Sequence, residues 1–240
     1  MFSDKFILLL IVTLRFFLVI NGGGETTCQK VTVIREILSN GFHRDLLTKV
    51  ELAAVEHTAG CGVIFKEHLP RGLYVDPYQL TSLQQHNVTE VLLLDHIDVE
   101  APEYLSLEHT LLVYAKPDPE CDGCFSATVP IHTRYHRPSE QHEEALVNLL
   151  NPQLLVRCNT GLLLKMCQVY PEEDAPCSVK DSTTCRWTGV MFKPVPELIL
   201  QVPVGLKQHE LVVCTVTFLA TLFSSVFVLA AVWKYGQFYI

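Results

Sequence analysis

The amino-acid sequence predicts a mainly β, sandwich-like domain followed by one C-terminal transmembrane α-helix. Short apolar or alternating runs follow one another at intervals of about 8 to 15 residues, separated by turn signals rich in proline and glycine. Near the C-terminus, residues 211–233 form a run of 23 residues without a charged side chain. The first pattern is typical of many short strands, and the second is typical of a helix that crosses a bilayer.

The N-terminal segment, residues 1–24, has the pattern of a secretory signal peptide. Lys5 precedes an apolar run at 6–14, and three glycines follow at 22–24, near which we expect cleavage. Arg15 interrupts the apolar stretch, so an uncleaved signal anchor is the alternative. Either interpretation places residues 25–209 in the lumen of the endoplasmic reticulum.

Residues 25–209 read as a series of strands. At 49–54, Val50 and Leu52 alternate with Lys49 and Glu51, which is the period of a half-buried strand. We expect strands at 46–56, 63–66, 91–97, 109–115, 126–136, 154–158, 162–169, 186–192 and 198–204. Two segments, 83–94 and 139–150, have weak helical patterns. The acidic stretch YPEEDAP at 170–176 reads as a solvated loop.

The C-terminal run 211–233 is long enough to cross a membrane. At about 1.5 Å per residue it spans about 34 Å, against a hydrocarbon core of about 30 Å. Trp233, Lys234 and Tyr235 suit the far interface, and residues 234–240 would form a short cytosolic tail. Small side chains recur at intervals of three and four residues and form one stripe on this helix: Cys214, Thr217, Thr221 and Ser225. The stripe predicts a helix–helix contact, and hydroxyls bonded to their own helix are the alternative.

The cysteines agree with an oxidising compartment. Eight of the nine precede the membrane run, namely Cys28, Cys61, Cys121, Cys124, Cys158, Cys167, Cys177 and Cys185. An even number predicts disulfides, whose connectivity the sequence leaves open. Cys121 and Cys124 form a C-x-x-C in a turn rich in proline and glycine, which favours a structural disulfide over a redox site. Asn87 begins a sequon, and we expect it to be glycosylated.

A cluster of basic side chains lies in the predicted strand 126–136. Alternation along a strand would place His132, Arg134 and His136 on one face and the apolar residues on the other. Pro130 favours an edge strand, because proline cannot donate to a neighbouring strand. Two interpretations stay open: a solvated edge face, or a surface that contacts an acidic partner or a phosphate.

Charge and motifs exclude several function classes. Residues 25–209 contain 24 acidic and 15 basic side chains, which argues against nucleic-acid binding and against a polybasic membrane surface. The sequence contains no phosphate-binding loop, dinucleotide fingerprint, zinc-protease motif or nucleophile elbow. We therefore expect no catalytic residues, no cofactor and no metal site.

Six blocks spread over nearly the whole chain carry a family resemblance. They read NGFHRDLLTKVEL (40–52), LPRGLYVDPYQL (69–80), APEYL (101–105), VPIHTRYHRP (129–138), LQVPVG (200–205) and KYGQF (234–238). These blocks resemble the PIG-X family, the accessory subunits of glycosylphosphatidylinositol mannosyltransferase I. The N-terminal 25 residues contain no such block.

The resemblance implies a single-pass type I glycoprotein of the endoplasmic reticulum membrane. It would bind and stabilise a multi-span catalytic subunit, PIG-M, which adds the first mannose, from dolichol-phosphate-mannose, to a glucosaminyl-phosphatidylinositol in the lumen. The stripe on the membrane helix and the His132–His136 face are the candidate partner-binding residues. From the residues alone two other classes stay open, a cell-surface adhesion or receptor module and a lumenal thiol oxidoreductase that uses Cys121 and Cys124.

Overall fold

The structure is a computed structural model that describes residues 31–52, 60–158 and 169–236. The predicted signal peptide at 1–24, Cys28 and Cys167 lie outside the described residues, as does nearly all of the strand expected at 162–169. The described elements and their bounds are β1 Val31–Ile37, β2 His43–Leu52, β3 Cys61–Leu69, β4 Leu73–Tyr74, α2 Pro77–Gln85, β5 Val91–Leu93, η1 Glu103–Leu105, β6 His109–Pro117, β7 Cys124–Thr133, β8 Glu144–Leu149, β9 Gln153–Cys158, β10 Val169–Pro176, β11 Thr184–Val190, β12 Leu198–Pro203, η3 Lys207–His209 and α3 Glu210–Tyr235.

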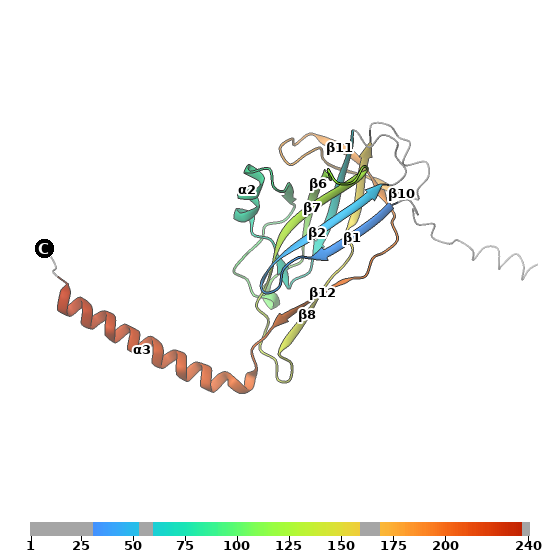
Figure 1. Cartoon of the computed structure of the whole chain (residues 1–240). Helices are drawn as coiled ribbons and strands as arrows, with labels where there is room; N and C mark the ends of the chain where they lie inside the picture. Colours follow the sequence, from blue (N-terminus) through green and yellow to red (C-terminus); the bar gives the residue numbers. More distant parts are fainter. Residues whose placement is uncertain (1–30, 53–59, 159–168, 237–240) are drawn as a thin grey trace, which may run out of the picture.

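The described strands form a two-layered β domain. Ten of them make one sheet in the order β1-β2-β7-β6-β3-β9-β11-β10, with β4 beside β7 and β5 beside β6, and β12 pairs with β8 in a separate ribbon. β7 meets β6 in register only where Phe125 and Ser126 lie opposite Pro117 and Lys116. From this junction the β1-β2-β7 layer and the layer around β3 face each other across the core (Figure 1). The structure thus confirms the mainly β fold with one C-terminal apolar helix.

The main core lies between the two layers. Val50 on β2, Phe65 on β3 and Ile131 on β7 are almost fully buried there. Neighbouring residues on the β3 layer point the other way, and Ile64 and Leu155 pack with Trp187 in a second, smaller cluster. Strands that are buried on both faces need continuous apolar runs, which explains why β3, β6 and β9 were recognisable from sequence.

Two helix predictions are wrong. Residues 144–149 form β8, in which Val147 and Leu149 are buried and alternate with exposed neighbours, because pairing with β12 supplies the partner strand that a helix would lack. The helix expected at 83–94 is instead α2, which begins at Pro77 behind the N-cap Asp76 and ends at Gln85. Proline at the first helical position after an aspartate is the start signal that the apolar spacing missed.

The prediction that β7 is an edge strand is also wrong, since β2 pairs along nearly its whole length and β4 and β6 pair with its two ends on the other side. Pro130 is tolerated for a local reason. The Thr133 amide donates to Phe42 on the β2 side, and the Arg134 amide donates to Gly72 on the opposite side. By alternation the Pro130 nitrogen points to that opposite side, where neither β4 nor β6 pairs with it.

The acidic stretch 170–176 is a strand and not a loop. It forms most of β10, which pairs with β11 at the end of the sheet. Glu172 contacts Arg186 of β11, and Glu173 forms an ion pair with Lys66 of β3. Charged side chains on an outermost strand protect its unpaired edge against association with other strands.

Candidate functional site

Helix α3 is the most exposed apolar element of the described chain. Together with η3 it is one helical segment, Lys207–Tyr235, and by length and composition it is long and apolar enough to cross a membrane. None of its side chains is buried against the β domain, and it extends away from that domain (Figure 1). Its surface therefore requires lipid or a partner to cover it.

The small-residue stripe follows one face of α3. At 100° per residue, Cys214, Thr217, Thr221 and Ser225 lie within one narrow sector of the helix. The Thr221 hydroxyl donates to the carbonyl of Phe218 at 2.8 Å, and Ser224 beside the stripe donates to Ala220 at 2.8 Å. The hydroxyl of Thr221 is thus satisfied within its own helix, so what the stripe offers a neighbour is above all close approach.

The basic cluster around β7 is not a solvated face, so that expectation is wrong. β7 ends at Thr133, and His132 and Arg134 are 7% and 2% exposed. The ring of His132 stacks on Tyr74 at 5.0 Å, and its Nε2 hydrogen-bonds to Gln79 Oε1 on α2 at 2.8 Å. Burial, reinforced by the nearby His43, lowers the pKa of His132. His132 is therefore a neutral packing residue between β7 and α2.

Arg134 has a comparable structural role. Its guanidinium lies 4.6 Å from the centroid of the Tyr74 ring, and its Nη1 donates to the carbonyl of Ala101 at 2.5 Å. These contacts join the end of β7 to the segment that leads into η1. Residues 135–138 leave the sheet beyond this point, and Tyr135 is 75% exposed. The exposed residues at this end of the basic cluster are thus Tyr135, Arg137 and Pro138, whereas His136 between them is half-buried.

Three disulfides are present in the described residues. Cys61 and Cys158 join β3 to β9 at directly opposed positions, and Cys177 is bonded to Cys185 across the β10–β11 turn. Cys121 is bonded to Cys124 in the turn between β6 and β7. Cys214 on α3 is a free, exposed thiol.

The surroundings of the C-x-x-C disulfide are unsuited to thiol exchange. Cys121, the first cysteine of the motif, lies in a turn that leads into β7, whereas the reactive thiol of a redox motif lies at a helix N-terminus. The turn also contains Asp118, Glu120 and Asp122, whose negative charge disfavours a thiolate. The geometry favours a structural disulfide here.

Asn87 lies in the turn after α2, with an exposed side chain. Its backbone has a φ of 54°, in the left-handed region that asparagine tolerates better than most residues. Thr89, the third residue of the sequon, is 3% exposed, and its hydroxyl has no hydrogen-bond partner among the described residues. The same part of the chain contains no group of three or more His, Cys, Asp or Glu side chains that could hold a metal ion.

A family model and three related proteins match most of this chain and carry related names. A family model described as PIG-X / PBN1 matches residues 39–233. Three relatives, each named GPI alpha-1,4-mannosyltransferase I, stabilizing subunit, are 42% identical to this chain. The Homo sapiens protein aligns over 91% of this chain and 86% of its own length, and the Rattus norvegicus protein over 90% and 87%. No solved structure matches. The segment matched by the family model, residues 39–233, contains β2 to β12 of the β domain and nearly all of α3.

Proposed function

Because the chain belongs to the PIG-X / PBN1 family, we propose that it is the non-catalytic stabilising subunit of the mannosyltransferase that adds the first mannose to the glycosylphosphatidylinositol anchor precursor. The observation that carries this proposal, beside the family, is the form of α3. A helix of this length whose side chains all remain exposed is suited to lie in a bilayer against the helices of a multi-span, PIG-M-like catalytic subunit.

The proposed topology is that of a type I protein of the endoplasmic reticulum membrane. Three disulfides in the β domain support an oxidising compartment on the N-terminal side of α3. Residues 25–209 would then lie in the lumen, 211–233 in the membrane and 234–240 in the cytosol. This arrangement places the β domain on the side of the membrane where the glycolipid would be mannosylated.

Stabilisation of the partner follows from mass action. A subunit that binds the folded catalytic chain and not its unfolded form lowers the fraction that is unfolded and degraded. At a concentration of about 100 times the dissociation constant, the effect on the partner is about 2.7 kcal/mol. No catalytic group is needed for this role, and the two parts of the chain supply separate contacts, one in the bilayer and one in the lumen.

The test is complementation of cells that lack their own subunit. Expression of the full chain should restore glycosylphosphatidylinositol-anchored proteins at the cell surface and raise the steady-state level of the catalytic subunit. A chain in which α3 is replaced by an unrelated apolar helix of equal length should restore less of both. If the full chain is made and folded but changes neither quantity, the proposed function is wrong.

A further inference from the structure

A hollow lies between the β domain and the first turn of α3. Its volume is about 880 Å³. Its walls include Tyr104 in η1, Tyr135 and Arg137 after β7, Lys207 in η3, and Val213 and Cys214 on α3. Because Val213 and Cys214 belong to the apolar helix, the hollow lies at the level where α3 would enter the bilayer. We refer to it as the juxtamembrane pocket.

Backbone hydrogen bonds hold the walls of the juxtamembrane pocket together. The Glu103 amide donates to the Tyr135 carbonyl at 2.9 Å, which ties η1 to the segment after β7. That segment is tied in turn to the start of α3, because the Ser139 amide donates to Gly205 at 2.8 Å and the Lys207 amide donates to Ser139 at 2.9 Å. Three segments that are distant in sequence are thus fixed relative to one another.

The pocket carries a cation that no carboxylate of the described residues neutralises. The Arg137 guanidinium lies 4.4 Å from the centroid of the Tyr104 ring, and within the described residues it forms no ion pair with a carboxylate. A second cation in the pocket wall, the ammonium of Lys207, is paired with Glu140 at 2.9 Å. The wall also contains one carboxylate, that of Glu210. The guanidinium is therefore positioned by an aromatic face and remains available to an anion.

From these contacts we propose that the juxtamembrane pocket binds the phosphate-containing headgroup of an anionic phospholipid in the adjacent leaflet. Arg137 would contact the phosphate, because a guanidinium donates two parallel hydrogen bonds to phosphate oxygens. Tyr104 and Tyr135 would occupy the headgroup layer, where tyrosine is enriched in membrane proteins. Val213 and Cys214 would adjoin the start of the acyl chains.

The local charge at Arg137, and not the charge of the whole chain, favours this occupant. The whole chain has a formal net charge of −8, so it has no general attraction to an anionic surface, and a lipid of this kind needs a local cationic contact. The inference depends on α3 crossing the membrane and goes beyond the proposed function. A segment of a partner protein is the competing occupant, and the experiment below separates the two.

The experiment uses the purified full chain in a mild detergent, titrated with dioctanoyl phosphatidylinositol, with the bound fraction read by native mass spectrometry. Replacement of Arg137 by Gln should weaken binding about fivefold, the effect of one cation near an anionic lipid. Tyr104→Ala should also weaken binding, whereas Tyr104→Phe should retain it because the ring remains. Glu140→Gln should strengthen binding, because it releases Lys207.

Two controls make the result specific. Arg186 is an exposed arginine on β11, outside the pocket lining, and Arg186→Gln should leave binding unchanged. Glycerophosphoinositol, which lacks acyl chains, should bind more weakly than the lipid, and equal binding would mean that the ligand is a soluble phosphate. Equal lipid binding by the wild type and Arg137→Gln would overturn the proposal. So would a loss of catalytic-subunit capture by Arg137→Gln with lipid binding intact, since the pocket would then be a protein interface.

Because the titration uses the purified chain alone, it gives a result whether or not the complementation experiment succeeds. A near-native circular dichroism spectrum and unchanged thermal unfolding would show that each variant is folded. Arg137 and Tyr104 are partly or largely exposed, so their replacement removes few core contacts.

Discussion

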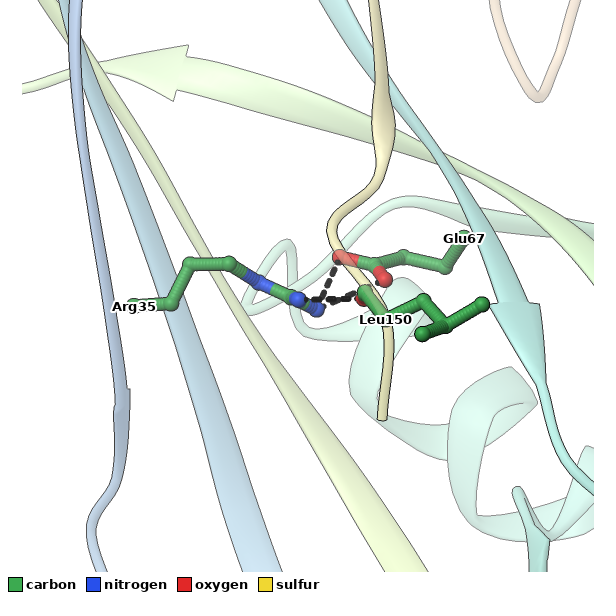
Figure 2. Close-up of polar contacts among 3 residues, drawn as sticks. All are labelled: Arg35, Glu67 and Leu150. Carbon is green, nitrogen blue, oxygen red and sulfur yellow. Dashed lines mark hydrogen bonds and ion pairs between the residues drawn. The ribbon is translucent and has the colours of Figure 1, made fainter. Parts of the chain in front are cut away.

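Arg35 and Glu67 meet inside the β domain, where Nη2 of Arg35 donates hydrogen bonds of 2.9 and 2.7 Å to the two carboxylate oxygens of Glu67 (Figure 2). Their side chains are 1% and 2% exposed. Nη1 of Arg35 also donates to the carbonyl of Leu150 at 2.6 Å. Arg35 on β1 is thus bonded both to β3, in the opposite layer, and to the segment between β8 and β9.

Breaking this pair from one side should strongly destabilise the domain. Arg35→Met leaves the Glu67 carboxylate buried without its cation, and we expect a loss of about 3–5 kcal/mol in the free energy of unfolding. Replacing both residues by Met should cost less than the single change, because no uncompensated charge remains. Urea unfolding, followed by the fluorescence of the buried Trp187, measures both. A double variant that is less stable than Arg35→Met would contradict this account.

The same carboxyl should give the domain a pH-dependent stability. Burial raises the pKa of Glu67 from 4.5 to about 7, and Arg35 opposes that rise only in part. A raised pKa means that the folded state holds the proton more tightly, so this contribution is complete below about pH 4.5 and is lost as the pH rises through about 7. The free energy of unfolding of the wild type, minus that of Glu67→Gln, should therefore fall by about 1–3 kcal/mol between about pH 4.5 and pH 8.

Comparison with Glu67→Gln at each pH is the necessary control. Burial lowers the pKa of His132, which makes both proteins less stable as the pH falls, and this opposite trend cancels in the difference. If the difference instead grows with rising pH, the ion pair outweighs burial and the pKa of Glu67 lies below its ordinary value.

The strand that carries Arg35 shows where sequence patterns are insufficient. β1 was absent from the predicted strands, since Arg35 occupies an inward position and Ile34, 48% exposed, points outward. Its inward residues are otherwise regular, as Val31 and Val33 are both buried. Alternation predicts which faces are apolar, but a buried charge depends on a partner 32 residues away, and that partner is set by the tertiary fold.

Sequence patterns likewise predict only those parts of the candidate site that depend on local spacing. The apolar helix and its stripe follow from local spacing, because helical geometry alone places those residues on one face. The solvated face expected for the basic cluster fails for two reasons. Tyr74 and α2 cover His132 within β7, and β7 ends at Thr133, so alternation no longer applies to Arg134 and His136. The juxtamembrane pocket joins residues from η1, the segment after β7 and α3, and no local pattern brings such segments together.

Removal of a disulfide should destabilise the domain more when the loop that it closes is longer, with a logarithmic dependence on loop length. Cys61–Cys158 spans 97 residues and Cys177–Cys185 spans 8. Cross-link entropy predicts that replacing the first pair by Ala costs roughly 2 kcal/mol more than replacing the second. Urea unfolding of the two double variants tests the order. Equal losses would mean that unfolded-state structure or local strain dominates.

Glycosylation of Asn87 tests the proposed topology. The positive φ makes Asn87→Gly a milder change than Asn87→Gln, and Thr89→Val keeps the shape of a buried residue whose hydroxyl has no partner in the described structure. Both variants should lose the same glycan, seen as a gain in gel mobility. The wild-type glycan should be sensitive to endoglycosidase H if the protein stays in the endoplasmic reticulum, whereas resistance would favour a cell-surface protein.

The stripe on α3 should contribute to capture of the catalytic subunit. Thr217→Leu with Thr221→Leu keeps the helix apolar, so membrane insertion should be unaffected, but it fills the surface of close approach. Because the Thr221 hydroxyl already bonds within α3, we expect the steric change to dominate over lost interhelical hydrogen bonds, which are worth about 0.6–1.7 kcal/mol each. The β domain supplies further contacts in this proposal, so the loss should be partial.

The matched control is Val212→Leu with Val216→Leu. Valine has nearly the shape of threonine, so bulk increases by a similar amount, while both positions lie on the face of α3 opposite the stripe at 100° per residue. Co-purification of the mannosyltransferase, and its steady-state level in cells that lack their own subunit, are the measurements. If the stripe variant captures and stabilises the catalytic subunit as well as the control does, α3 serves as an anchor alone. The β domain must then hold the complex, and the exposed residues beside Arg137 are where its contacts should be sought.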